Sequence, residues 1–247
     1  MLERFPKAPI TEALIDLKVE MSDRISVSQL EDLHSAIKEV YPGKKSRRRW
    51  EQRLEFREGK EPVSSEAKNL GVDGYLFWSA DEKQVVQFRL DGFTFSRLRP
   101  YSDWTQICGE AANLWNIYVE GAKPIQVTRL ALRYINAIEI PLKTFELEQY
   151  FTSPPKVPPG LPEILEHFFS RILIQFPEEG AKAFVTLALS ETKDPLVTPV
   201  LLDIDAFMEV QLTPKDAKIW DSLAVLRRLK NEVFKRSLRE RTLELFR

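Results

Sequence analysis

KQVVQFRLDGFTFSRLR, residues 83–99, has the pattern of two strands joined by a tight turn. Apolar and polar side chains alternate on both sides of Asp91-Gly92, as they do on strands with one buried face. Asp-Gly between two such runs favours a two-residue hairpin, because glycine tolerates the positive φ that this turn requires. We therefore expect strands at about 83–90 and 93–99, with a turn between them.

The same pattern recurs in the second half of the chain. Val86-x-x-x-Leu90-Asp91-Gly92-Phe93 precedes Leu98-x-Pro100, and Val200-x-x-x-Ile204-Asp205-Ala206-Phe207 precedes Leu212-x-Pro214. Pro9-Ile10 opens the first half and Pro124-Ile125 the second. The recurrence predicts an internal duplication, and repeated units tend to pack by pseudo-symmetry. Register with Asp91 makes Asp205 a turn residue in this interpretation.

Apolar periodicity and helix-capping signals predict the other elements. In a first unit, residues 1–123, we expect strands at 10–20, 49–57 and 74–80, a loop at 59–73, and helices at 26–41 and 103–120. In a second unit, residues 124–247, we expect strands at 126–140, 171–177, 182–190, 200–204 and 207–212, a short helix around 145–151, and a final helix from Thr213-Pro214. Each unit then has the order β-α-β4-α.

This order predicts an α+β fold in which two tandem units form a mostly antiparallel sheet with helices packed on one side. The two units are expected to make one continuous structural domain. The element order and the repeat resemble a duplicated TATA-box-binding-protein-like unit and, more distantly, START-like helix-grip domains. The resemblance implies a curved sheet with helices on its convex side.

Three further stretches carry a family resemblance. They are Phe5-x-x-x-Pro9-Ile10-x-Glu12-Ala13, Leu132-Arg133-Tyr134-Ile135-Asn136-x-Ile138-x-Ile140-Pro141, and a C-terminal Phe234-x-x-Ser237-Leu238. Together they resemble a sporadically distributed prokaryotic family of uncharacterised proteins, over nearly the whole chain. The resemblance transfers no catalytic residues. Patchy distribution implies an accessory, defence-associated role.

Composition narrows the class of protein. The chain has 247 residues, of which 43% are hydrophobic and 30% charged, and its net charge is −1. This is enough apolar material for a sizeable core, and the balanced charge provides no general attraction to nucleic acids or acidic membranes. A single cysteine, the absence of a secretory signal and the absence of a long apolar run predict a cytoplasmic protein that does not enter a membrane.

The sequence offers little catalytic chemistry. His34 and His167 have no partner at a metal-ligand spacing, so we expect neither a metal nor a cofactor. Cys108 lies on an apolar helix face, where a small buried hydrophobe is expected rather than a nucleophile. Asp203 and Asp205 could point to one strand face as paired carboxylates, but a turn role for Asp205 is favoured. An enzymatic role is the least supported reading.

A basic segment is the clearest charge feature. Residues 44–60 contain eight basic and three acidic side chains. A basic stripe beside an indole can bind phosphates and stack a base, although Lys and Arg on a solvated strand edge also discourage unwanted pairing. The candidate nucleic-acid-binding residues are Lys44, Lys45, Arg47, Arg48, Arg49, Trp50, Arg53, Arg57, Arg89, Arg97 and Arg99.

Two other functions follow from the predicted fold. The leading hypothesis is a non-enzymatic interaction protein that binds a protein partner or self-associates, through a sheet edge or the final helix. A small apolar ligand between sheet and helices is an alternative, with Phe77, Phe88, Phe93 and Trp115 lining its pocket. Arg133 and Asn136 fall on opposite faces of one strand, so one of them points inward and needs a hydrogen-bond partner.

Overall fold

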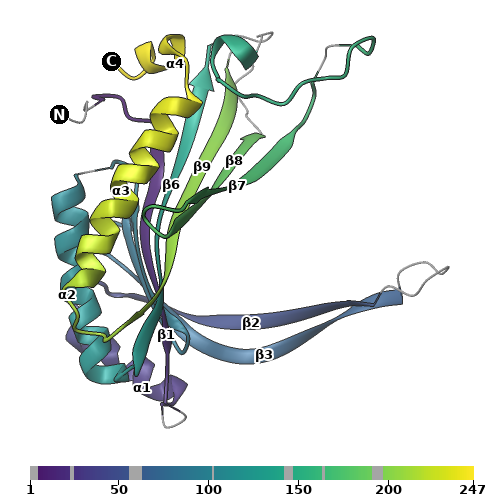
Figure 1. The fold of residues 1–247 in the computed structure, drawn as a ribbon. Coiled ribbons are helices and arrows are strands. Elements are labelled where there is room, and N and C mark those ends of the chain that lie inside the picture. The colour runs from purple at the N-terminus through teal and green to yellow at the C-terminus, as the bar shows by residue number, and fades with distance from the viewer. Residues whose placement is uncertain are drawn as a thin grey trace.

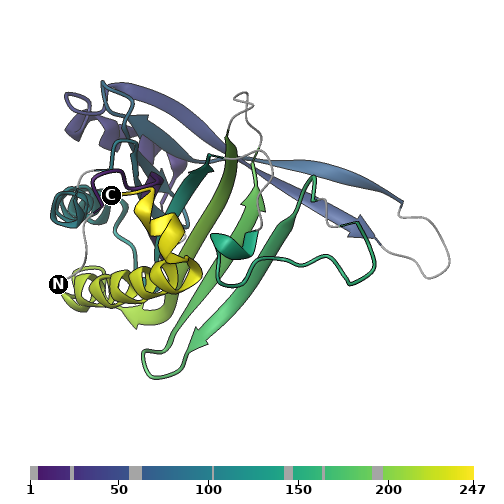
Figure 2. The same cartoon turned by 90° about the horizontal axis from the view of Figure 1, so that it is seen from above.

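The computed structural model describes residues 5–22, 25–55, 63–101, 103–141, 147–162, 165–190 and 197–247. These residues form a nine-stranded antiparallel sheet with α1, α2 and α3 on one side of it (Figures 1 and 2). The predicted α+β class and antiparallel sheet are confirmed.

The bounds of the elements are as follows. The strands are β1 (Ile10–Glu20), β2 (Gly43–Glu55), β3 (Val63–Trp78), β4 (Gln84–Arg89), β5 (Gly92–Leu98), β6 (Gln126–Ile140), β7 (Phe169–Phe176), β8 (Ala181–Leu189) and β9 (Thr198–Leu212). The helices are α1 (Val27–Asp32), α2 (Trp104–Ala122), α3 (Lys218–Ser237) and α4 (Glu240–Glu244), with 3-10 turns at Leu33–Ala36 and Leu147–Gln149.

The strand order is symmetric about the β1–β6 pair except for β2, which has no counterpart in the second half. It runs β2-β3-β4-β5-β1-β6-β9-β8-β7. β1 and β6, the first strands of the two halves, pair with each other. Outside them lie β5 and β9, the last strands of the two halves, and then β4 and β8. A duplicated chain would give this arrangement, and the duplication itself stays a prediction.

The β1–β6 pair assigns side chains to the two faces of the sheet. Register places Ile15 beside Leu132 and Leu17 beside Leu130. All four side chains are fully buried on the face that the helices cover. Because side chains alternate along a strand, the intervening residues, Asp16 among them, point to the opposite face.

The hydrophobic core joins the two halves of the chain. One cluster contains Ile15 and Phe93 from the first half together with Leu132, Ala206 and Leu223 from the second. Helix α2 begins after Asp103, whose carboxylate accepts a hydrogen bond from Gln106 N at 3.1 Å. Its Trp115 Nε1 donates to Pro214 O at 2.9 Å and ties α2 to the segment before α3. A second cluster, around Ile138, Phe151, Leu202, Val233 and Phe246, lies at the other end of α3.

Strand β3 corrects the first-half prediction. The expected loop at 59–73 is a strand from Val63 onward, which pairs with β2. Sequence periodicity missed it because β2 and β3 leave the sheet as a long two-stranded arm (Figure 1), where no buried face imposes an apolar alternation. The first helix is also shorter than expected, since α1 ends at Asp32 and is followed by a 3-10 turn.

The second half departs from the predicted strand count. β9 is continuous from Thr198 to Leu212, so the expected turn at Asp205-Ala206 is wrong, and three strands replace the expected four after β6. Asp205 has no glycine after it, and β9 is held straight by its pairing with β6 on one side and β8 on the other. The short helix is a 3-10 turn at Leu147–Gln149, and the final helix begins at Lys218.

Within the described ranges, no helix is both long enough and apolar enough to cross a bilayer.

The β4–β5 hairpin gives a stability prediction. Gly92 has φ +153°, and a Cβ there would lie 2.2 Å from Leu17 O. We expect Gly92→Ala to lower the free energy of unfolding by roughly 2–3 kcal/mol, from backbone strain and a clash with β1. Urea unfolding measures this change.

The matched control is Gly109→Ala. Gly109 is an exposed residue inside α2, and a Cβ there meets nothing within 4 Å. Alanine should stabilise the protein at this position by roughly 0.5–1 kcal/mol, because it suits a helix better than glycine does. Equal effects of the two substitutions would contradict the close approach of β1 to the hairpin.

Candidate interaction surfaces

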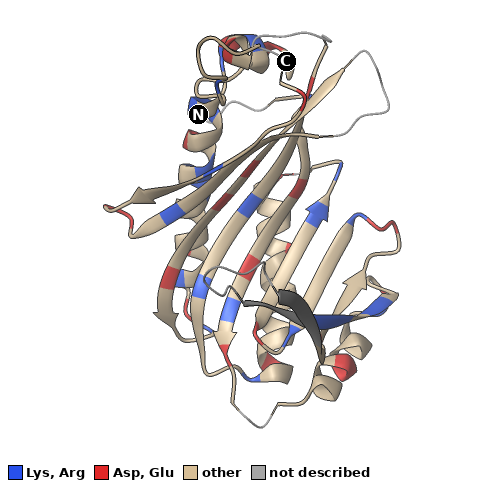
Figure 3. Cartoon of the chain, turned by 90° about the vertical axis from the view of Figure 1, so that its right-hand side faces the viewer, with Lys and Arg blue, Asp and Glu red and all other residues tan. Residues whose placement is uncertain are grey.

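Figure 3 views the sheet from the side opposite the helices and shows charged residues along its central strands. Side-chain alternation puts Asp16 of β1, Arg129 and Arg133 of β6, and Asp203 and Asp205 of β9 on this face. We call it the uncovered face.

A chain of ion pairs crosses the uncovered face. We name it the charge ladder; its members, in spatial order, are Asp73, Arg47, Asp91, Arg89, Asp16, Arg129 and Asp205, with the neighbouring pair Arg133 and Asp203. The charge ladder contains four arginines and five aspartates, so its positive and negative charges nearly cancel. The ladder runs from β2 at one end to β9, and each charge is held by a neighbour on another strand or turn.

Asp16 lies at the middle of the charge ladder. Its Oδ1 accepts hydrogen bonds from Arg89 Nη2 at 2.9 Å and from Thr94 Oγ1 at 2.6 Å. Its Oδ2 lies 3.6 Å from Arg129 Nη1. The Asp16 and Arg89 side chains are only 14% and 10% exposed, so these charges are shielded from water and depend on each other.

Arg133 and Asp203 form the best-aligned pair. Arg133 Nε donates to Asp203 Oδ1 at 2.8 Å and Nη2 donates to Oδ2 at 2.6 Å, a bidentate geometry. The hydrogen bonds to Asp203 raise the pKa of Arg133 further above its usual range. On the other face Asn136 is buried and donates from Nδ2 to Leu202 O at 2.9 Å. The prediction that one of the two residues points inward and is hydrogen-bonded is confirmed for Asn136.

Asp205 is less well compensated. Its nearest cation is Arg129, at 3.4 Å between Nη2 and Oδ2. Burial raises the pKa of Asp205 above its ordinary value, against the opposing effect of Arg129 and Arg133. The Arg129 guanidinium also lies 4.5 Å from the centroid of the Phe207 ring. Asp205 is therefore a strand residue in a charge network, where the sequence predicted a turn.

The outer edge of the sheet at β7 is apolar. Among the described residues, five of the eight exposed large hydrophobic side chains lie between positions 161 and 173: Leu161, Leu165, Phe169, Ile172 and Leu173. In β7 itself Phe169, Ile172 and Leu173 are 66%, 54% and 52% exposed. The one charged residue of β7, Arg171, stacks over Phe184 of β8 at 4.2 Å. β7 therefore presents a mostly apolar strand with a single charged residue.

The structure divides the predicted basic residues into three groups. Arg47 and Arg89 belong to the charge ladder, and Lys44 pairs with Glu31 at 2.7 Å. Arg97 is in register with Ala13 and so lies on the helix-covered face, away from Arg89. Exposed side chains are Lys45, Arg48, Arg49 and Arg99. Trp50 and Arg53 are placed on β2 by their backbone alone, and Arg57 lies outside the described residues.

The four predicted pocket residues come together, but as core. Phe77, Phe88, Phe93 and Trp115 are at most 1% exposed. Successive ring centroids lie 5.5, 6.1 and 5.6 Å apart, the spacing of packed aromatic side chains. These rings fill the space between sheet and helices where the sequence suggested a ligand.

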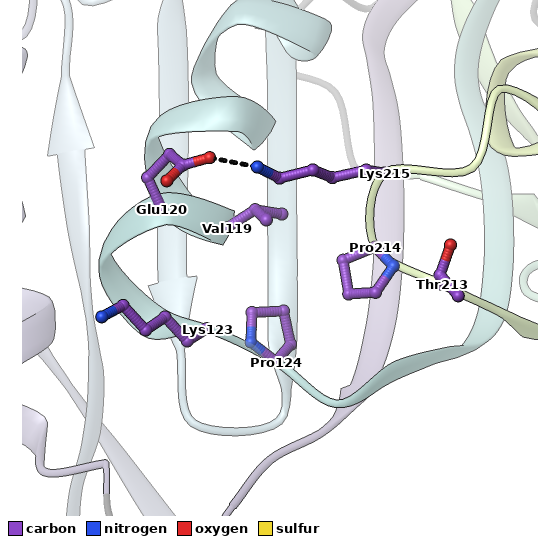
Figure 4. A pocket seen from close by; sticks show the side chains of 7 residues that line it. All are labelled: Val119, Glu120, Lys123, Pro124, Thr213, Pro214 and Lys215. Carbon is purple, nitrogen blue, oxygen red and sulfur yellow. Dashed lines mark hydrogen bonds and ion pairs between the residues drawn. The ribbon is translucent and has the colours of Figure 1, made fainter.

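An open hollow lies elsewhere, at the end of α2 (Figure 4). Its volume is about 380 Å³, and its lining includes Val119, Pro124 and Pro214. Glu120 and Lys215 form an ion pair across its rim at 2.5 Å. Both charged side chains are about 70% exposed, so the hollow is a solvated surface feature.

No family model, no curated protein and no solved structure matches the chain.

The sequence signal for the charge ladder is a spacing. Arg129 and Arg133 are four residues apart, and Asp203 and Asp205 two apart, so each pair shares a strand face. Which strands are neighbours, and in which register, could not be read from the sequence. That is why Asp205 was assigned to a turn and Arg89 to a phosphate-binding surface.

The charge ladder predicts opposite effects for two neighbouring aspartates. Because burial raises the pKa of Asp205, its ionised form opposes folding at neutral pH, and Asp205→Asn should raise the free energy of unfolding there. In the wild-type protein, ionised Asp205 costs nothing at a pH below the pKa that this carboxyl has in the unfolded chain. The cost grows as the pH rises towards and through the higher pKa that Asp205 has in the folded protein. The gain from the substitution should therefore shrink as pH falls towards about 4.

Asp203→Asn is the control. It removes one side of the bidentate pair with Arg133 and should cost about 1–3 kcal/mol at pH 7. Urea unfolding of both variants between about pH 4 and pH 8 checks the two signs. If Asp205→Asn lowered the free energy of unfolding as much as Asp203→Asn does, the claim that the charge of Asp205 is poorly paired within the charge ladder would be contradicted.

Proposed function

We propose that the protein is a non-enzymatic interaction protein that self-associates through the outer edge of β7. The observation that carries this proposal is the set of exposed apolar side chains on the last strand of the sheet, Phe169, Ile172 and Leu173. An edge strand presents unpaired backbone N–H and C=O groups, and proteins usually protect such edges with charge, proline or a covering element. An apolar edge with a single charge, Arg171, favours pairing with another strand.

The opposite edge of the sheet provides the contrast. β2 carries Lys44, Lys45, Arg47, Arg48 and Arg49 along its length. Two such strands side by side would bring like charges together, which disfavours pairing. Of the two sheet edges, only β7 is suited to a second copy of the same chain.

The sequence of β7 is compatible with pairing to itself. In an antiparallel pair centred on Ile172, Arg171 lies opposite Leu173 of the second copy, and centred on Leu173 it lies opposite Gln175. In neither register do two charged side chains lie opposite each other. The pair would extend the sheet across a two-fold axis, as homodimers commonly do.

The charge ladder fits a role in shaping the sheet. Arg89 and Arg129 are already bound to aspartates, so they are poorly placed to take up phosphates. Lys45, Arg48 and Arg49 are exposed on β2, and this observation keeps nucleic-acid binding as the second candidate function. The family resemblance would place either activity in an accessory prokaryotic system.

The self-association proposal predicts a concentration-dependent dimer. Because one strand pair buries a small area, we expect dissociation on the order of 1–100 μM. Leu173→Lys should give a monomer, since an ammonium group at the edge repels its symmetry mate and cannot be buried unpaired. Sedimentation equilibrium over a range of protein concentrations measures the change.

Leu70→Lys is the matched control, because Leu70 is also exposed, at 44%, but lies on β3 in the arm. It should dimerise like the wild-type protein. A monomeric wild-type protein at about 200 μM, or a dimer that Leu173→Lys leaves intact, would contradict the proposal.

A further inference from the structure

Lys230 is a buried amine that has no counter-ion among the described residues. It lies on α3, 7% exposed, with Nζ 3.6 Å from the centroid of the Tyr134 ring of β6. Among the described residues, no carboxylate lies within ion-pair distance of Nζ and none accepts a hydrogen bond from it. Burial, helped by the charge of Arg227, lowers the pKa of Lys230 to about 7. A buried amine in this state gains stabilisation from any anion that reaches it.

Arg227 lies one helical turn before Lys230 and faces the same way. Its guanidinium sits 5.5 Å from the centroid of the Trp104 ring, and within the described part of the chain it makes no ion pair. It is partly exposed, so it connects the buried amine to solvent. Two adjacent cations that lack acidic partners form a local positive charge in a protein whose net charge is −1.

Two tyrosine hydroxyls and a thiol lie near these cations. Tyr134 Oη lies 3.1 Å from Tyr101 Oη, just before α2 begins. Trp104, the ring beside Arg227, is the first residue of α2, whose N-terminus is already capped by the Asp103 carboxylate. The Cys108 thiol of α2 is the other titratable group nearby, and burial raises its pKa, so it stays uncharged.

We propose that Lys230 and Arg227 form a binding site for an oxyanion, a phosphate or carboxylate group, between α3 and the N-terminal end of α2. The guanidinium binds the anion from the solvent side, and the amine binds it from the core. The tyrosine hydroxyls and the indole of Trp104 select a ligand whose anionic group is attached to an apolar or aromatic body. The site does not depend on self-association through β7.

Anion binding at this site is coupled to proton uptake. Near pH 7 a substantial fraction of Lys230 is neutral, and the anion favours the protonated amine. The affinity should therefore be highest below pH 7 and fall as pH rises through the pKa of Lys230 in the complex. The groups that face Lys230 are Arg227 of α3 and Tyr134 of β6, and Tyr134 in turn faces Tyr101 before α2 and Cys108 of α2.

Isothermal titration calorimetry with inorganic sulfate tests the proposal, because sulfate keeps its charge throughout the pH range used. The wild-type protein should bind one sulfate with millimolar affinity at about pH 6, and about tenfold more weakly at about pH 8.5. Benzoate serves as the carboxylate arm. Tighter binding of benzoate identifies a carboxylate ligand, and tighter binding of sulfate a phosphate-like one.

Three variants separate a site from general attraction. Lys230→Met should weaken sulfate binding about tenfold at pH 6 and abolish its pH dependence. Arg227→Gln should weaken binding but keep the pH dependence. Arg228→Gln is the control, because Arg228 is exposed and pairs with Glu179 at 2.7 Å, and it should bind like wild type.

Circular dichroism confirms that each variant is folded. The absence of saturable binding of either anion at about 50 mM and pH 6 would overturn the proposal. Equal affinity in wild type, Lys230→Met and Arg227→Gln would overturn it as well.

Discussion

β1 and β6 lie side by side at the centre of the sheet, and their pairing joins the two halves of the chain. Register aligns Ile15 with Leu132 and Leu17 with Leu130, so both strands turn the same apolar face to the helices. The pairing also decides what lies on the other face, since Asp16 of β1 can meet Arg129 of β6 only in this register. A slip of one residue would bury these charges and expose the leucines.

The other strands of the sheet lie on both sides of the β1–β6 pair. Helices cover one face, and the uncovered face is stabilised by charges that neutralise one another. The two outermost strands differ in chemistry: β2 is strongly basic, whereas β7 is apolar and carries one charge, Arg171. The two proposed binding regions are the β7 edge, where apolar side chains are exposed to solvent, and the Lys230 region, where a buried amine has no acidic partner among the described residues.

The sequence predicted the elements whose signals are local. The bounds of β6, Gln126–Ile140, were predicted correctly, and so was the β4–β5 hairpin, because apolar alternation and turn chemistry lie within a few residues. The turn itself is Leu90-Asp91, one residue earlier than predicted, since Gly92 already pairs with Arg89. Features that depend on distant partners were missed. Asp205 belongs to a strand because it meets Arg129, and Lys230 is buried because α3 packs against Tyr134. Neither contact leaves a signal in its own stretch of sequence.

Amide hydrogen exchange tests the central role of the β1–β6 pair most directly. If this pair unites the sheet, the amides of Ile15, Leu17, Leu130 and Leu132 should be among the slowest to exchange, and should exchange together, through global unfolding. Their exchange free energies should converge on the value from urea unfolding. Two separate groups, one containing β1 to β5 and the other β6 to β9, with different exchange free energies, would show that the halves unfold independently and would contradict this account.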